Sequence, residues 1–239
     1  MAVDVADTSL LGLLEQDYGD KVELCIDHHP SNRLYAENTL LDGGAAAVGE
    51  IIYRLLTPLG AELTPAIAEA IYTAISTDTG CFRYSNVTAR THRIAAKLLD
   101  IGIDSHEINR AMFETKTRAR LRLEREMLET LEYRMGGRMV LMTLTEKMIE
   151  DAGACEGDTD GLSAIPRGIE GVDIGVMLRE VSGGFKISLR TTRSVNASEI
   201  GKLFGGGGHA AAAGCFIKGT AEIARDKICE AVEHVLEEK

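Results

Sequence analysis

The stretch VELCIDHHPSN, residues 22–32, places an Asp and two adjacent His at the end of a short apolar run. The apolar residues predict a buried strand over residues 22–27. His28 and His29 are neighbours, so on an extended chain one side chain can bind a metal while the other faces a ligand. Asp27 can accept the N–H of an imidazole and fix its tautomer. The alternative is a polar loop with histidines placed by chance, which two of the six His side by side behind an Asp disfavour.

Helical patterns follow this strand. Apolar residues at helical spacing predict helices over residues 43–60, 64–80 and 88–102, the second with Thr64 as its N-cap. A strand followed by helices that pack on it is typical of a parallel sheet. We therefore expect an α/β fold in which residues 1–112 form a parallel-sheet domain.

The pattern changes after a charged segment. Residues 113–136 predict a long linker helix with an apolar stripe of Leu121, Leu128 and Leu131. The strands and the closing helix predicted beyond it cover residues 139–144, 173–181, 185–192, 211–219 and 220–237. A Ser-Gly-Gly turn joins the second and third of these strands and predicts a hairpin. We expect a smaller, mixed α/β domain over residues 137–239.

Composition narrows the function classes. The 239 residues are 45% hydrophobic and 26% charged, a balance that is ordinary for one large or two modest domains. The net charge of −11 argues against non-specific binding to long nucleic acid, but it leaves room for a small anion in a local basic pocket. Five scattered Cys without a CxxC pattern argue against a disulfide framework or zinc knuckle. With no apolar run of membrane-spanning length and no basic leader, we expect a cytoplasmic protein without a membrane partner.

Two further carboxylates are candidate metal ligands. In VDVAD, Asp4 ends a strand-like start, although a helix cap or turn Asp is the alternative. Asp78 closes the helix predicted over residues 64–80, where the helix dipole disfavours an anion, so we expect a metal ion or Arg83 beside it. An exposed loop Asp is the alternative there. Two carboxylates and an imidazole on separate loops at the carboxyl edge of a parallel sheet suit Mn²⁺ or Mg²⁺. The usual chemistry of such a site is attack of metal-bound hydroxide on a phosphate ester.

The stretch FGGGGHAAAAG, residues 204–214, is a candidate anion site. Its glycines allow a backbone to approach a ligand closely, and His209 is embedded among them. Arg190 and Arg193, at the end of a predicted strand, can add charge-assisted bonds to phosphate oxygens. The alternatives are a flexible glycine loop and, for Arg193, a solvated strand end.

Together these motifs resemble a known family. IDHHPSN resembles the signature of the DHH phosphoesterases, and GGGGHAAAAG resembles the glycine–histidine motif of their companion DHHA1 domain. VDVADTSLLG and STDTGCFRY are similar to the family's second and fourth motifs. The resemblance spans nearly the whole chain and is strongest to the RecJ-like oligoribonuclease/pAp-phosphatase type.

This resemblance implies a role for each matched residue. Asp4 would bridge two Mn²⁺ or Mg²⁺ ions, His28 and Asp78 would ligate one of them, Asp27 would orient the site and His29 would face the phosphate. Asp27 and His29 are thus the catalytic candidates. The residues implied to bind the substrate in the second domain are Arg190, Gly206, Gly207, Gly208 and His209.

One motif departs from the family. Its first motif, a His followed by two Asp, should precede Asp4, and only Met-Ala-Val does. We therefore expect an N-terminally truncated DHH domain, an incomplete two-metal site and an exposed sheet edge that favours a homodimer. Three explanations stay open: a shortened chain, which we favour, a segment supplied by another chain, or an enzyme that now only binds.

The hypothesis from the sequence is a metal-dependent phosphodiesterase or phosphatase with 3′–5′ exonuclease-like activity. Its substrates would be short oligonucleotides (nanoRNA) or small nucleotides such as pAp or cyclic dinucleotides, with weak or absent turnover by this chain. The alternative is a nucleotide-binding module without catalysis. An inorganic pyrophosphatase of the same superfamily is disfavoured, because that group carries a different second domain.

Overall fold

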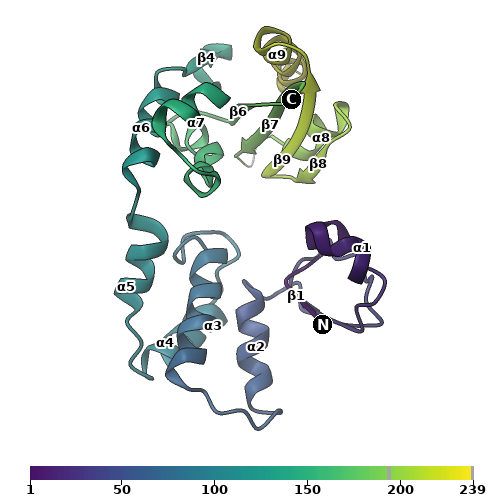
Figure 1. The fold of residues 1–239 in the computed structure, drawn as a ribbon, viewed down its shortest axis with the longest axis vertical. Helices are drawn as coiled ribbons and strands as arrows, with labels where there is room; N and C mark the ends of the chain where they lie inside the picture. Colours follow the sequence, from purple (N-terminus) through teal and green to yellow (C-terminus); the bar gives the residue numbers. More distant parts are fainter. Residues whose placement is uncertain (193–194, 238–239) are drawn as a thin grey trace. The chain divides into compact units, whose positions relative to one another are not determined.

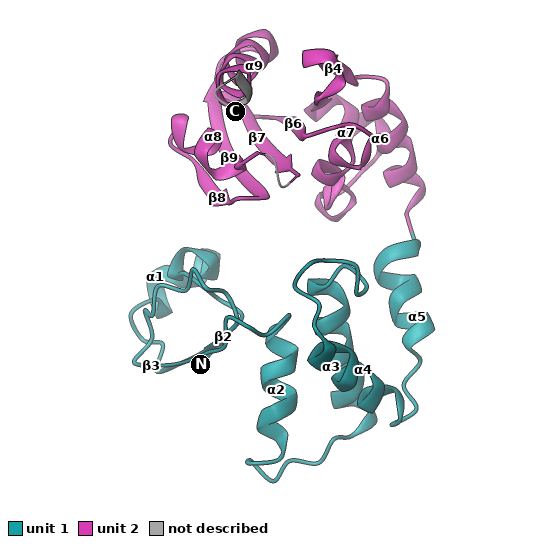
Figure 2. Ribbon diagram, turned by 180° about the vertical axis from the view of Figure 1, so that it is seen from behind, with its two compact units in different colours: residues 1–115 teal, residues 116–239 magenta. Residues whose placement is uncertain are grey.

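The protein forms two compact units, residues 1–115 (unit 1) and residues 116–239 (unit 2), coloured separately in Figure 2. The computed structural model describes residues 1–192 and 195–237, so Arg193 lies outside the described residues. In this part of the chain, no helix is both long and apolar enough to cross a membrane. Each unit has its own sheet and hydrophobic core.

Unit 1 contains a three-stranded parallel sheet in the order β1-β2-β3. Its strands are β1 (Ala2–Val3), β2 (Leu24–Asp27) and β3 (Asn38–Leu41). The central strand β2 ends at Asp27, where the predicted strand ends. Val3 pairs with Ile26, so Asp4 and Asp27 come next on two adjacent parallel strands and reach the same edge of the sheet.

Three helices, α2, α3 and α4, lie beside one another in unit 1 (Figure 1). The helical elements of this unit are η1 (Thr8–Leu14), α1 (Glu15–Tyr18), α2 (Val48–Leu56), α3 (Pro65–Asp78), α4 (Ala89–Leu99), α5 (Ser105–Asn109) and η2 (Arg110–Glu114). The side chain of Thr64 accepts a hydrogen bond from the backbone N–H of Ile67, as expected of an N-cap. Ile71, Ile75 and Leu98 pack together between these helices. The three predicted helices are thus confirmed, although the first begins only at Val48.

Unit 2 contains a mixed six-stranded sheet in the order β4-β5-β6-β7-β9-β8. The strands are β4 (Glu132–Arg134), β5 (Met139–Leu144), β6 (Ile174–Val181), β7 (Gly184–Thr191), β8 (Gly207–His209) and β9 (Ala212–Lys218). β5 and β6 are parallel and the other neighbours are antiparallel. The predicted strands and the hairpin between β6 and β7 are confirmed, which confirms the mixed α/β fold expected of this region.

Helices cover the two faces of this sheet unequally. The helical elements of unit 2 are α6 (Arg118–Leu128), η3 (Met135–Gly137), α7 (Glu146–Ala152), η4 (Glu156–Thr159), η5 (Leu162–Ala164), η6 (Pro166–Gly168), α8 (Ala197–Leu203) and α9 (Ala221–Glu237). On one face, Leu189 of β7 shares a buried cluster with Ile200 of α8 and Ile228 of α9. On the other face, Met177 of β6 packs with Leu123 of α6, which lies over the β5–β6 side of the sheet.

The long linker helix predicted over residues 113–136 does not form. Its helical part is α6, which ends at Leu128 and is preceded by a break where Thr117 caps the helix through the N–H of Arg120. The predicted apolar stripe is also wrong: Leu121 is 53% exposed, whereas Leu123 and Met127 are buried. Leu123 and Met127 are four residues apart, so they share the helix face that packs on the rest of unit 2.

Candidate functional site

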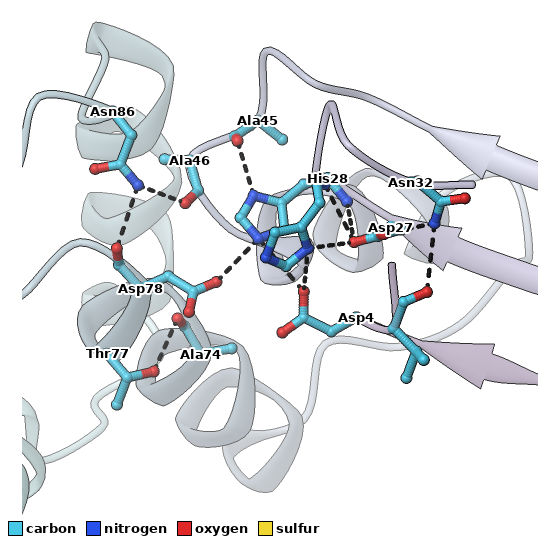
Figure 3. A network of polar contacts seen from close by, with 12 residues as sticks. Asp4, Asp27, His28, Asn32, Ala45, Ala46, Ala74, Thr77, Asp78 and Asn86 are labelled. Carbon is cyan, nitrogen blue, oxygen red and sulfur yellow. Dashed lines mark hydrogen bonds and ion pairs between the residues drawn. The ribbon is translucent and has the colours of Figure 1, made fainter. Parts of the chain in front are cut away.

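Asp4 follows strand β1 in an unusual backbone conformation. Its φ is 63°, a left-handed value that Asp adopts more readily than most residues, and its N–H donates to the carbonyl of Ile26 at 2.9 Å. The turn brings the Asp4 carboxylate to 3.3 Å from Nε2 of His28 (Figure 3). Asp7, from the same short stretch, instead caps η1 by accepting from the N–H of Ser9. Asp7 therefore caps a helix, whereas Asp4 belongs to the site.

His28 is held between a carbonyl and two carboxylates (Figure 3). Its Nδ1 lies 3.2 Å from the carbonyl oxygen of Ala45, which can only accept, so Nδ1 carries a proton. Its Nε2 lies 3.3 Å from Asp4 and 3.4 Å from Asp78, and the side chain is only 14% exposed. The hydrogen bond to Asp4 raises the pKa of His28 above its ordinary value, against the effect of burial. An unprotonated Nε2 would face two carboxylates, so a proton or a cation must lie among these atoms.

Asp78 ends helix α3, as predicted. Burial, and then the charge of Asp4, raise the pKa of its carboxyl group above the ordinary value. Arg83 is not its partner, because Arg83 Nε donates to the carbonyl of Gly80 at 2.6 Å. The positive charge expected beside Asp78 is therefore supplied by His28 when protonated, or by a cation. Asn86 closes this part of the site by donating to the carbonyls of Asp78 and Ala46.

Asp27 is fully buried at the end of β2 and its carboxylate oxygens are already bonded. Oδ1 accepts from Nδ1 of His29 at 2.8 Å and from the backbone N–H groups of His28 and His29 at 2.7 and 3.2 Å. Oδ2 accepts from Nδ2 of Asn32 at 2.6 Å. Burial alone would raise the pKa of Asp27, but these hydrogen bonds lower it below the ordinary value. Asp27 therefore stays ionised and fixes the tautomer and direction of His29, with Nε2 of His29 left for another contact.

The donor set fits a divalent cation. Ligand atoms of Asp4, Asp27, His28 and His29 all lie within 4.8 Å of one another, and Asp78 meets the same nitrogen of His28. Carboxylate oxygens and an imidazole nitrogen suit Mn²⁺, Mg²⁺ and similar ions. Asp27 accepts three hydrogen bonds at Oδ1 and one at Oδ2. The bonds from the two His to Asp27 and to the carbonyl of Ala45 are typical of groups that orient metal ligands.

Two of the predicted residues of unit 2, Arg190 and His209, lie in one row across the sheet. Gly175 of β6 pairs with Arg190 of β7, Arg190 pairs with Ala212 of β9, and Ala212 pairs with His209 of β8. Directly paired residues project from the same face of a sheet, so Arg190 and His209 share a face with only Ala212 between them. With strands about 4.8 Å apart, the two are about 10 Å apart along the row.

The glycine run has mainly a packing reason. A Cβ at Gly206 would lie 2.1 Å from the carbonyl oxygen of Gly214, and one at Gly208 would lie 2.5 Å from that of Ala212. Gly208 also has a φ of 143°, in the region that favours glycine. A Cβ at Gly207, in contrast, would meet nothing within 4 Å. Gly207 is thus the one of these three predicted residues at which a side chain would meet open space.

Sequence reasoning missed three groups that position the site. Asn32 lies inside the quoted IDHHPSN stretch, but its bond to Asp27 depends on the turn after β2. The carbonyl of Ala45 and the amide of Asn86 come from loops that meet the site only after α2 and α3 have packed. No local sequence signal marks these two.

Comparisons with known proteins agree with the two units. Residues 139–238 match the family model of the DHHA1 domain. The chain is 36% identical over 212 residues to the bifunctional oligoribonuclease and PAP phosphatase NrnA of Thermus thermophilus, a match that covers 88% of this chain and 64% of that protein. It is 27% identical over 195 residues to the protein of the same name in Bacillus subtilis, covering 80% of this chain and 61% of that one. The chain therefore spans less than two thirds of these relatives.

A solved structure shows the same arrangement of elements. The crystal structure of an exopolyphosphatase-related protein from Bacteroides fragilis superposes with a TM-score of 0.87 at 28% identity, over 97% of this chain and 71% of that one. The predicted resemblance to the DHH/DHHA1 family is confirmed by these matches, and the match to the DHHA1 domain covers residues 139–238.

Proposed function

We propose that this DHH/DHHA1 protein is a metal-dependent phosphoesterase that hydrolyses short oligonucleotides or small nucleotides such as nanoRNA, pAp or cyclic dinucleotides. The observation that carries the proposal is the meeting of Asp4 and Asp78 at the same nitrogen of His28, a cluster that requires a positive charge. The names of the Thermus and Bacillus relatives support the substrate class. The resemblance favours Mn²⁺, with Mg²⁺ as the alternative ion.

Asp4, His28 and Asp78 would hold the divalent ion. The ion would supply positive charge beside the phosphate and lower the pKa of a coordinated water. The bond from Nδ1 of His28 to the carbonyl of Ala45 directs Nε2 toward the ion, because it fixes which nitrogen carries the proton.

His29 would contact the phosphate that is cleaved. Its Nδ1–H donates to the ionised Asp27, so Nε2 faces the phosphate and donates to a phosphate oxygen when the imidazole is protonated. A donor fixed in this way offsets negative charge as it develops on the phosphate. The buried Asp27 would hold this geometry, since its Oδ1 also accepts from the backbone N–H groups of His28 and His29.

Arg190 and His209 would bind a phosphate group of a nucleotide in unit 2. Arg guanidinium groups bind phosphate by two parallel hydrogen bonds, and the open backbone at Gly207 allows a ligand to come close. The competing function is nucleotide binding without catalysis.

Hydrolysis of a labelled dinucleotide and of pAp, with and without Mn²⁺, tests the proposal. We expect Mn²⁺-dependent turnover by the chain, and we expect His29→Ala to lower turnover while Mn²⁺ binding, followed by electron paramagnetic resonance, is retained. If nucleotide binds without turnover at any Mn²⁺ concentration, the catalytic proposal fails for this chain and the binding module replaces it. An upstream-extended form assayed in parallel shows whether catalysis needs further residues.

A further inference from the structure

The backbone of Arg167 crosses directly over the sheet position beside Arg190. A Cβ placed on Gly175 would lie 2.6 Å from the backbone nitrogen of Arg167 and 2.9 Å from Cβ of Pro166, so η6 covers Gly175 on the side to which a side chain would project. Gly175 pairs with Arg190, and directly paired residues project from the same face. Arg167 and Arg190 therefore lie on the same face of the sheet, in neighbouring positions.

Neither of these guanidinium groups is neutralised in the described part of the chain. Arg190 donates to the carbonyl of Leu189, and neither Arg190 nor Arg167 forms an ion pair with a described carboxylate. Burial lowers the pKa of Arg190 below its ordinary value, and the charge of Arg167 lowers it further. Other arginines of this unit that do pair with a carboxylate are Arg120, Arg125, Arg134, Arg138, Arg179 and Arg225.

The row is open to a ligand on the Ala212 side of Arg190. Gly175, the other neighbour in register, is covered by η6, whereas the small side chain of Ala212 places nothing bulky beside the guanidinium. Arg167 and His209 are both exposed, at opposite ends of this row. Two like charges held together and left open repel each other unless an anion lies between them.

We propose that Arg167 and Arg190 together bind one phosphomonoester group of the nucleotide, a phosphate that is not the one cleaved. This inference rests on the proposed function for the identity of the ligand as a nucleotide. A terminal phosphate carries a charge of about −1.5 to −2 at pH 7, which two guanidinium groups match. An internal phosphodiester carries about one negative charge and gains less from the second Arg. Arg167 thus makes the protein selective for nucleotides with a terminal phosphate, such as pAp or a 5′-phosphorylated dinucleotide.

Equilibrium binding of two dinucleotides tests this selectivity. The probes are pApA, which has a terminal phosphate, and ApA, which lacks it, titrated in EDTA so that neither is hydrolysed. For Arg167→Gln we expect the affinity for pApA to fall about tenfold, the size of one charge-assisted hydrogen bond, with ApA changed less than about twofold. Arg167→Lys should recover part of the loss. Arg134→Gln is the matched control, because Arg134 is exposed, pairs with Glu132 and lies on the edge strand β4.

The outcomes separate this inference from the proposed function. An equal loss of pApA and ApA binding in Arg167→Gln, an unchanged pApA affinity, or no pApA binding by the unchanged chain would overturn the inference. Mn²⁺-dependent hydrolysis of ApA is measured on the same proteins. If ApA is hydrolysed but Arg167→Gln does not change pApA affinity, the selectivity is refuted and the phosphoesterase proposal stands. If Arg167→Gln weakens pApA binding but no substrate is hydrolysed, the selectivity stands and the phosphoesterase proposal is refuted. Thermal unfolding of Arg167→Gln, expected to match that of the unchanged chain because Arg167 is exposed, verifies the fold.

Discussion

The two units gather charges of opposite sign and leave them incompletely neutralised. In unit 1, Asp4 and Asp78 converge on one nitrogen of His28, which calls for a cation. In unit 2, Arg167 lies beside Arg190 with no described carboxylate between them, which calls for an anion. The comparison teaches that each unit gathers charge of its own sign, for a cation in the first and for an anion in the second, so that each cluster can be disrupted separately.

The largest expected effect is on the cation half, the cluster of Asp4, His28 and Asp78 in unit 1. We predict that His28→Ala lowers Mn²⁺ affinity, measured by electron paramagnetic resonance, by more than about 100-fold, because loss of a direct ligand exceeds the 10- to 100-fold typical of groups that only orient ligands. Binding of pApA in EDTA should be unchanged. Asp7→Asn, which alters the cap of η1 in the neighbouring stretch, is the control and should leave Mn²⁺ affinity intact. Mn²⁺ binding that survives His28→Ala would remove the basis for the cation half.

The next effect concerns the glycine run that shapes unit 2. Gly206→Ala places a Cβ 2.1 Å from the carbonyl oxygen of Gly214, so we expect a loss of about 1–3 kcal/mol in the free energy of unfolding. Gly207→Ala, where a Cβ meets nothing within 4 Å, should cost much less. Urea unfolding of both variants measures the difference. Equal stabilities would show that the run is not required by packing.

A smaller effect on ligand affinity is expected from a change in the anion half, the pair Arg167 and Arg190 in unit 2. Arg190→Gln should lower the affinity for pAp, titrated in EDTA, by about tenfold, because one charge-assisted interaction is lost. Mn²⁺ affinity of the same variant should stay within error, since Arg190 belongs to the other unit. A simultaneous loss of Mn²⁺ affinity would break the division of roles between the units.

The smallest effect is a pH dependence of the stability of unit 2, at a residue outside both sites. The hydroxyl of Thr117 and the N–H of Cys155 lower the pKa of Asp158 below its ordinary value. A lowered pKa stabilises the folded state above the unfolded value of about 3.8, and this contribution is lost as the pH falls through the folded value. Asp158→Asn should therefore reduce the acid sensitivity of unit 2 below about pH 4, followed by circular dichroism. Asp160→Asn is the control, and the same change in both would refute the assignment.

The residues of the cation half could be predicted because they lie in short motifs at the ends of regular elements. Asp27 ends one strand, His28 and His29 follow it, and Asp78 ends a helix whose cap at Thr64 was visible in the sequence. Their orientation was not predictable, because the carbonyl of Ala45 reaches His28 only through tertiary packing. The expectation that Arg83 offsets Asp78 failed for a similar reason, since a local turn takes up Arg83.

The anion half was predicted only in part. Arg190 and His209 were identified from their motifs, but their shared face depends on strand register, which no single motif encodes. Arg167 was missed because its place follows from the backbone that crosses Gly175. The long linker helix was overpredicted because its charged, helix-favouring composition continues past both ends of α6, while the cap at Thr117 divides it.

The two-residue strand β1 has a consequence for the order of folding. The backbone bond from Asp4 to Ile26 joins parallel strands, so it forms only after the long loop between β1 and β2 has closed, at an entropic cost that no nearby contact offsets. Arg190 lies instead in the antiparallel β6–β7 hairpin, whose pairing begins with Val181 and Gly184 and can therefore start from contacts that are close in sequence. We expect amide hydrogen exchange to protect Arg190 before Asp4 during refolding. The helices of unit 1 would then assemble first, and the ligand cluster would be completed last, by a strand that holds few bonds of its own.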